Sequence, residues 1–144
     1  MKIKDYRVAE GSKINLKKWP TKVKSICKSK EDSQKFLEEQ VSRLSGLQRM
    51  MAADSRYALL VIFQGMDAAG KDGAIKHVLT GINPQGCKVS NFKVPGPDEL
   101  NHDFLWRASL RLPERGRIGI FNRSHYEDVL VAKVHKEVLD KQNL

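Results

Sequence analysis

Cysteines and long apolar runs are scarce in this sequence of 144 residues. The only two cysteines, Cys27 and Cys87, lack the paired spacing of a metal site. So few thiols are typical of a reduced, cytoplasmic protein and not of a disulfide-linked secreted one. The longest apolar run, residues 57–63, is far too short to cross a bilayer, and the first residues lack the apolar segment of a signal peptide. We therefore expect a cytoplasmic protein without a membrane-spanning segment.

Acidic residues are also few, with 17 Asp and Glu against 26 Lys and Arg, for a formal net charge of +9. The excess lies in residues 1–30, which hold ten Lys or Arg and two acids, whereas residues 31–144 are nearly balanced. The basic segment either attracts a polyanion (polyphosphate, nucleic acid or a membrane surface) or is simply solvated. We divide the chain into a basic N-terminal extension, residues 1–31, and a core, residues 32–144.

Helical and strand-like patterns alternate along the core. Helices are predicted over 32–53, directly after 73, over 98–112 and over 124–139, and strands over 57–63, 87–94 and 117–121. The last helix is expected to turn Tyr126, Val129, Leu130, Val134 and Val138 inward. This order predicts an α/β fold with a parallel sheet.

The strand at 57–63 is apolar throughout, so we expect it to be central and covered on both faces. Three strands make a small sheet. We therefore expect the fold to be incomplete at its C-terminal end, with an open edge of this strand covered by further chain or by a partner.

A glycine-rich loop with the spacing G-x-x-x-x-G-K follows this strand and leads into a helical pattern. Strand, loop and helix in this order are the context of a phosphate-binding loop. Backbone N–H groups and the positive end of the helix dipole bind phosphate oxygens there, and the Lys71 ammonium adds a full charge. The other predicted phosphate-binding residues are Gly65, Met66, Ala68, Ala69, Gly70, Asp72 and Gly73.

Two aspartates depart from the usual form of such a loop. Asp72 stands where Ser or Thr normally gives a hydroxyl to Mg²⁺, and Asp67 lies inside the loop. A carboxylate ~4 Å from a phosphate charge is repelled by about 4 kcal/mol at an effective dielectric of ~20, unless a cation lies between them. We therefore predict that Asp67 is a magnesium ligand. The alternative is that it faces solvent and closes the turn.

A second polar cluster follows the strand at 117–121, where ligands bind in open α/β sheets. It comprises Asn122, Arg123, Ser124, His125, Glu127 and Asp128. Arg123 suits a transferring phosphoryl group, and Glu127 and Asp128 are candidate magnesium ligands. Alternatively, Ser124 and Glu127 form a capping box that only closes the helix start. We expect His125 to be a packing or hydrogen-bonding residue.

The motifs GMDAAGKDG and FNRSHYEDVLV together resemble the polyphosphate kinase 2 family, and NPQG, PDELNHDFLWR and LPERGRIGIF fit the same family. The resemblance covers residues 6–139. It implies a P-loop kinase-like fold, similar to thymidylate kinase, with helices on both sides of a parallel sheet. The family's essential positions fall on Asp67, Lys71, Asn122, Arg123, Glu127 and Asp128, and we expect the metal at Asp67 and Asp128.

The resemblance implies reversible, Mg²⁺-dependent phosphoryl transfer between inorganic polyphosphate and a nucleoside mono- or diphosphate. The expected partners are polyphosphate, a nucleotide (AMP, ADP or ATP) and Mg²⁺, with no nucleic acid or membrane, in a homo-oligomer. Two alternatives stay open: an ATP-dependent nucleoside monophosphate kinase, and a non-catalytic module that binds polyphosphate. Family members continue into a basic lid that this sequence lacks, so we expect the 144-residue chain to turn over slowly.

Overall fold

The computed structural model describes residues 6–20, 25–128, 130, 133–135, 137–138 and 140. The chain forms two compact units, Met1–Glu38 and Glu39–Leu144, each of which is described by itself. The first contains the short helix η2 (Leu16–Lys18) and the start of helix α1 (Lys30–Asp54), and residues 6–20 are all exposed. The separate basic extension over residues 1–31 stays a prediction. No described helix has the length and apolar character needed to cross a membrane.

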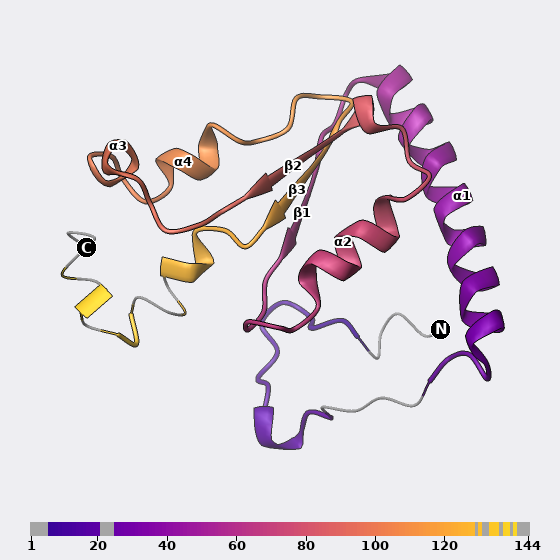
Figure 1. Cartoon of the computed structure of the whole chain (residues 1–144), viewed down its shortest axis with the longest axis horizontal. Coiled ribbons are helices and arrows are strands. Elements are labelled where there is room, and N and C mark those ends of the chain that lie inside the picture. Colours follow the sequence, from indigo (N-terminus) through magenta and orange to yellow (C-terminus); the bar gives the residue numbers. More distant parts are fainter. Residues whose placement is uncertain are drawn as a thin grey trace. The chain divides into compact units, whose positions relative to one another are not determined.

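The second unit alternates strands and helices. After α1 come β1 (Leu59–Phe63), α2 (Lys71–Leu79), η3 (Pro84–Gly86), β2 (Cys87–Asn91), α3 (Pro97–Leu100), α4 (Trp106–Ser109) and β3 (Ile118–Asn122). The three strands form one parallel sheet in the order β1-β3-β2 (Figure 1). The predicted α/β fold with a parallel sheet is therefore confirmed.

The central strand is β3, and β1 lies at one edge of the described sheet. Residues 118–121 of β3 are buried, whereas β1 is only half-buried and its first residue, Leu59, is exposed. The open edge predicted for the strand at 57–63 is therefore present among the described residues, whereas its predicted central position is not found in this three-stranded sheet. An apolar run indicates that both faces of a strand are covered, but it carries no information about how many strands pair with it.

Helices cover both faces of the sheet. On one face Ile120 of β3 packs with Ile75 of α2. On the other face Phe121 packs with Ala108 of α4 and with Phe92. Because successive side chains of a strand point to opposite faces, β3 contributes neighbouring residues to two separate cores. Figure 1 shows α2 on one side of the sheet and α3 and α4 on the other.

The segment 98–112, predicted as one helix, contains the two short helices α3 and α4 with a turn between them. Asp103 makes this break. Its side chain accepts a hydrogen bond from the Leu105 N–H at 2.9 Å, and its carbonyl accepts one from the Trp106 N–H at 2.8 Å. A short acidic side chain that bonds to nearby backbone N–H groups competes with the helical pattern, and here it starts α4 instead of continuing α3.

The predicted helix over 124–139 is also interrupted. Tyr126 and Glu127 are helical, but Lys133 and Val134 lie in a turn. Tyr126, Leu130 and Val134, which were expected to face inward, are exposed. Val129, from the same predicted face, lies outside the described residues.

Gly119 lies where the central strand passes close to Pro113. A Cβ at Gly119 would be 2.8 Å from ring atoms of Pro113. We expect Gly119→Ala to lower the free energy of unfolding by about 1–3 kcal/mol, as overpacking does, in urea denaturation. Gly46→Ala in α1 is the matched control, because nothing lies within 4 Å of a Cβ there. It should stabilise the protein by up to about 1 kcal/mol through helix propensity. A Gly119→Ala protein as stable as the parent would contradict the close contact.

Candidate functional site

The carboxyl ends of all three strands meet at one edge of the sheet. Phe63 of β1 and Asn91 of β2 both stand in register with Asn122 of β3. The Arg123 N–H donates to the Phe63 carbonyl at 2.9 Å, and the Phe92 N–H donates to the Asn122 carbonyl at 3.0 Å. The glycine-rich loop leaves β1 at this edge, so the structure brings the two sequence motifs together.

The loop between β1 and α2 is exposed and turns through left-handed backbone. Ala68 has a φ of 60°, and Gly70, the residue before α2, has a φ of 84°. Glycine adopts this conformation without steric strain, which explains its place at the start of the helix. Residues 66–70 are exposed to solvent. The exposed loop leads into the start of α2, where the positive end of the helix dipole favours anions.

Lys71, the first residue of α2, folds back over this loop. Its Nζ donates to the carbonyls of Gly65 at 2.7 Å and Met66 at 2.8 Å. An ammonium group has three donors, so one N–H is left for a phosphate oxygen. The lysine predicted to bind phosphate is therefore held in place by the backbone of the loop itself.

Arg123 connects the two motifs. Its guanidinium is paired with Asp67 of the loop, and Nη1 lies 3.9 Å from Oε1 of Glu127. The Arg123 backbone has a φ of 63°. A left-handed conformation costs a residue other than glycine on the order of 1–3 kcal/mol, and such strain concentrates at functional sites. The arginine predicted to bind the phosphoryl group thus reaches the phosphate loop from a strained turn.

Gln64 fixes the Glu127 carboxylate, because its Nε2 donates to Oε1 of Glu127 at 2.7 Å. The Glu127 side chain therefore faces the site and does not close a capping box. The Ser124 hydroxyl accepts from the Tyr126 N–H at 3.1 Å, and the Glu127 N–H donates to the Ser124 carbonyl at 3.0 Å. Sequence reasoning missed Gln64. Its signal was its position, as a polar residue directly after the apolar strand.

Asn122 ties helix α2 to the strand ends. Its Nδ2 donates to Oδ1 of Asp72 at 2.5 Å and to Oδ1 of Asn91 at 2.9 Å. The carboxylate that replaces the usual Ser or Thr therefore holds the first turn of α2 against β3 and, through Asn122, against β2. Oδ1 of Asn122 is buried and has no hydrogen-bond partner among the described residues. Asn91 was also missed, although it ends β2 as Asn122 ends β3.

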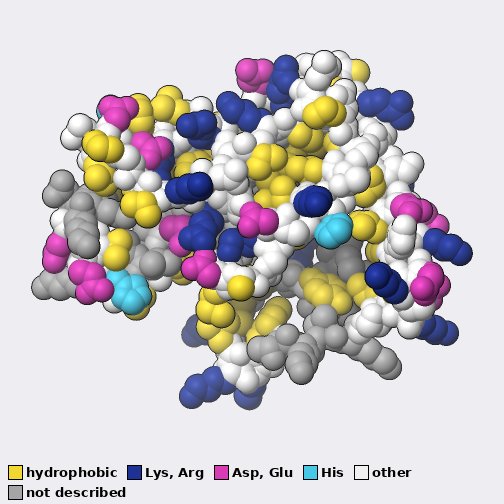
Figure 2. All heavy atoms as spheres, in the orientation of Figure 1, with side chains coloured by type: hydrophobic (Ala, Val, Ile, Leu, Met, Phe, Trp, Pro, Cys, Tyr) yellow, Lys and Arg dark blue, Asp and Glu magenta, His cyan; other side chains and the backbone are white. Residues whose placement is uncertain are grey.

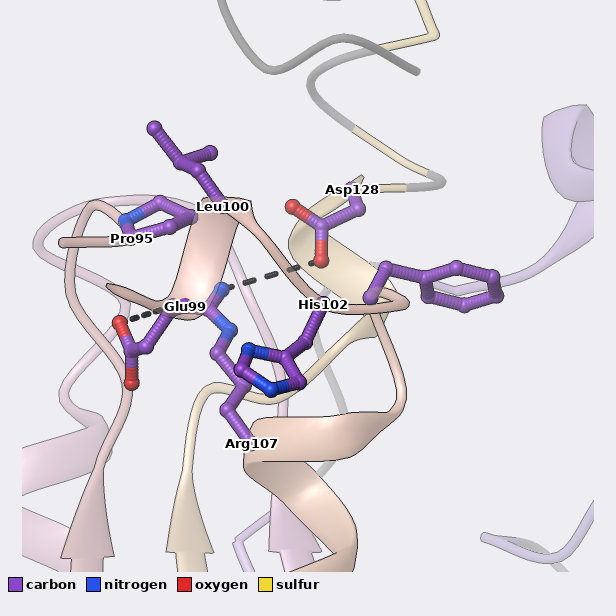
Figure 3. A pocket seen from close by; sticks show the side chains of 7 residues that line it. Pro95, Glu99, Leu100, His102, Arg107 and Asp128 are labelled. Carbon is purple, nitrogen blue, oxygen red and sulfur yellow. Dashed lines mark ion pairs between the residues drawn. The ribbon is translucent and has the colours of Figure 1, made fainter. Parts of the chain in front are cut away.

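Asp128 faces a small pocket around Arg107 (Figure 3). The Arg107 guanidinium lies 3.7 Å from Oδ2 of Asp128 and 3.7 Å from Oε2 of Glu99, and it donates to the Lys93 carbonyl at 2.8 Å. Both Arg107 and Asp128 are buried. Burial raises the pKa of the Asp128 carboxyl, and the Arg107 charge acts in the opposite direction. The predicted metal ligand is thus paired with a buried cation.

Arg107 was not among the predicted site residues. The available signal was its position as the last residue of the motif PDELNHDFLWR. His125, expected to pack or to hydrogen-bond, has its ring 4.5 Å from that of Tyr126 and 6.4 Å from that of Phe104, between centroids.

Comparison with known proteins identifies the family. The chain matches the model of "Polyphosphate kinase 2 (PPK2)" over residues 27–144. The chain belongs to the PPK2 family. It is 58% identical over 142 residues to an ADP-polyphosphate phosphotransferase of Rhodopseudomonas palustris, a match that covers 99% of this chain and 49% of that protein. It is 41% identical over 133 residues to an AMP/ADP-polyphosphate phosphotransferase of Meiothermus ruber, covering 92% of this chain and 50% of the relative.

The chain therefore spans about half the length of the curated relatives that it matches. A solved PPK2 structure shows the same fold: that of polyphosphate kinase 2 from Arthrobacter aurescens TC1 has a TM-score of 0.81 at 36% identity, and the match covers 94% of this chain and 50% of that chain. The predicted family resemblance and the predicted P-loop kinase-like fold are confirmed by these matches.

The buried Arg107 should support the stability of this PPK2 chain. We expect Arg107→Met to lower the free energy of unfolding by about 3–5 kcal/mol, because it leaves Asp128 and Glu99 without their cation. The matched control is Arg56→Met. Arg56 is exposed and pairs with Asp54 at 2.7 Å, and losing such a pair costs less than about 1 kcal/mol.

The effect of Arg107→Met should also depend on pH. In the folded protein the pKa of Asp128 is above its ordinary value of 3.8. The free energy of unfolding therefore falls as pH rises from this ordinary value to the raised pKa of the folded protein. Removing Arg107 should raise this pKa further. The destabilisation measured in urea should therefore be larger at neutral pH than at acidic pH, where the Asp128 carboxyl takes up a proton. An equal loss at both pH values would show that Arg107 acts through packing alone.

Proposed function

We propose that this protein transfers a phosphoryl group between inorganic polyphosphate and a nucleoside mono- or diphosphate. In the synthetic direction polyphosphate becomes one phosphate shorter and the nucleotide gains that phosphate, and the reaction is reversible. The observation that carries the proposal is that Lys71 and Arg123 contact one exposed glycine-rich loop from two different elements. The names of the relatives, as ADP- and AMP/ADP-polyphosphate phosphotransferases, support the two substrate classes.

The mechanism depends on positioning and charge, because phosphoryl transfer needs little covalent chemistry from the protein. The terminal phosphoryl group of polyphosphate lies over the loop N–H groups and accepts from the free donor of Lys71. Arg123 leaves Asp67 and binds the transferring group with its planar fork, which spreads the charge of the transition state. Glu127, fixed by Gln64, keeps the guanidinium oriented toward the loop.

Magnesium fits this arrangement through Asp67. Mg²⁺ is usually bound by one or two carboxylates, with water and substrate phosphates as further ligands. The Asp67 side chain is 84% exposed in the phosphate loop. Asp128, the second predicted ligand, is buried and paired with Arg107, so it would have to leave that pair to bind the metal. The described residues contain no group of three or more His, Cys, Asp or Glu placed to hold a metal ion. When bound, Mg²⁺ supplies positive charge that offsets the repulsion between Asp67 and phosphate.

One assay tests the proposal. The 144-residue chain, and the chain with any natural continuation beyond Leu144, are incubated with polyphosphate, Mg²⁺ and AMP or ADP, and nucleotides are separated by chromatography. Nucleotide phosphorylation that requires polyphosphate is the expected result. Phosphorylation with ATP but not with polyphosphate as donor would identify an ATP-dependent kinase. Polyphosphate binding without turnover in either form would identify a binding module.

Arg123→Lys should reduce turnover at least about 100-fold, because the loss of one transition-state donor costs on the order of 10²–10³ and a point charge does not replace a bidentate fork. The Michaelis constant for the nucleotide should change much less. Arg115→Lys is the matched control, since Arg115 is exposed in the turn before β3. An Arg123→Lys enzyme with normal turnover would exclude Arg123 as the group that stabilises the transition state.

Asp67→Asn should raise the Mg²⁺ concentration required for half-maximal activity and leave the unfolding midpoint unchanged, because the side chain is exposed. The Mg²⁺ dependence of initial rates and a urea unfolding curve measure the two effects. Asp54→Asn, at the end of α1, is the control for a change of charge alone. If Asp67→Asn kept the Mg²⁺ dependence of the parent, Asp67 would not be a metal ligand.

A further inference from the structure

A hollow of about 400 Å³ lies entirely within the N-terminal unit, Met1–Glu38. Three exposed cationic residues line it, Arg7, Lys13 and Lys18, and its lining contains no Asp or Glu. Among the described residues, none of the three has an ion-pair partner. Because like charges repel one another, an anion placed between them would be attracted by all three. We call this feature the basic hollow.

Two backbone turns form part of the wall of the basic hollow. The Ser12 N–H donates to the Ala9 carbonyl at 3.2 Å, and the Lys18 N–H donates to the Asn15 carbonyl at 2.9 Å. The Ser12 hydroxyl also donates to the Ala9 carbonyl, at 2.5 Å, and Oδ1 of Asn15 accepts from the Lys17 N–H at 3.1 Å. The uncharged polar side chains of the lining thus bond within the turns, which leaves the cationic side chains as the groups that meet a ligand.

Apolar side chains complete the lining of the basic hollow, and they include Val8, Ile14 and Trp19, all of which are exposed. Apolar neighbours lower the local dielectric, so they strengthen the attraction between a cation and an anion. The aliphatic stems of Lys and Arg can also lie along such surface while their charged ends stay at the ligand. The composition of the hollow therefore favours recognition by charge.

Inorganic polyphosphate fits these features better than a nucleic acid does. Its phosphates are joined directly through shared oxygens, whereas a sugar separates the phosphates of a nucleic acid. Polyphosphate therefore brings more negative charge into a hollow of this size. A single-stranded nucleic acid is usually bound through several aromatic side chains on which successive bases stack. Trp19 is the only aromatic residue among those that line the hollow.

We propose that the basic hollow is a second binding site for polyphosphate, separate from the phosphate loop. The assignment rests on the proposed function for the choice of polyanion, and it goes beyond that function because the hollow takes no part in the transfer. A polyphosphate long enough to contact both sites gains affinity from their linkage, whereas a short one occupies a single site at a time. Affinity should therefore depend on chain length, and this dependence should come from the hollow.

Binding of labelled polyphosphate, followed by fluorescence anisotropy, tests the role of the three cations. The hollow variant combines Arg7→Gln, Lys13→Gln and Lys18→Gln in the 144-residue chain. It should weaken binding of long-chain polyphosphate at least about tenfold, equivalent to ~1.4 kcal/mol. Binding of tripolyphosphate, measured by competition, should change less than about threefold, because the phosphate loop is intact.

The matched control variant combines Lys28→Gln, Lys30→Gln and Lys35→Gln. These lysines are exposed in the same unit and do not line the hollow, so the loss of charge is equal. Long-chain affinity in the control should stay within about threefold of the unmodified protein, since the basic hollow is intact. Equal weakening in the two variants would overturn the site, because the N-terminal unit would then act only through its net charge.

Trp19 supplies a direct readout of the basic hollow. The chain has two tryptophans, so Trp106→Phe leaves Trp19 as the only one. Long-chain polyphosphate should protect Trp19 from quenching by acrylamide, and the protection should be lost when the hollow variant is added. Binding without protection of Trp19 would overturn the site. ADP or a single-stranded oligonucleotide that protects Trp19 as well as polyphosphate does, at equal phosphate concentration, would overturn the choice of ligand.

The outcomes separate this assignment from the proposed reaction. Protection of Trp19 by polyphosphate, in a protein that transfers no phosphoryl group from it, would support the second site and overturn the reaction. Phosphoryl transfer from polyphosphate that leaves Trp19 unprotected would do the reverse. The absence of any polyphosphate binding by the unmodified protein would overturn both.

Discussion

The in-register parallel pairing of β1 and β2 with β3 determines where every group of the site begins. Because Phe63, Asn91 and Asn122 end their strands side by side, the segments that follow them leave the sheet from one edge. The Asn122 amide then joins this edge to α2 through Asp72. A slip of one residue in β3 would turn its side chains to the opposite faces and remove Asn122 from both partners. Core packing and site geometry are therefore set by one register.

The ion pairs of Arg123 and Arg107 differ in burial, and therefore in how much they stabilise the protein. Near the solvent, Arg123 pairs with Asp67, and exposed pairs of this kind are weak enough for a phosphate to displace. In the interior, Arg107 lies between Glu99 and Asp128, where removal of one partner is strongly destabilising (Figure 3). The first pair can exchange partners during substrate binding, whereas the second holds the loops that carry the site. Figure 2 shows Lys and Arg side chains distributed widely over the visible face.

The sequence predicted local features well, because their signals are local. Strand, loop and helix around Lys71 follow from spacing and periodicity, and the family motifs extend them to a P-loop fold. The position of β3 at the centre could not be predicted, since it depends on pairing between distant segments. Gln64, Asn91 and Arg107 have local signals in the sequence, but the role of each depends on a partner far away in the chain. The break at Asp103 had a local signal, a short acidic side chain that bonds to nearby backbone N–H groups. The prediction of one helix over 98–112 followed the helical periodicity instead.

The turn after β3 explains how a flexible side chain acts with precision. Arg123 has a left-handed backbone, and its N–H is bonded to Phe63. Ser124 behind it is fully buried, and its hydroxyl accepts from the Tyr126 N–H. The turn is thereby over-determined, which is the condition under which backbone strain persists. Only the rotamers of Arg123 remain to be ordered, and Asp67 and Glu127 already restrict them. To bind a phosphate, the Arg123 guanidinium then only has to exchange Asp67 for the phosphate, and the turn does not refold.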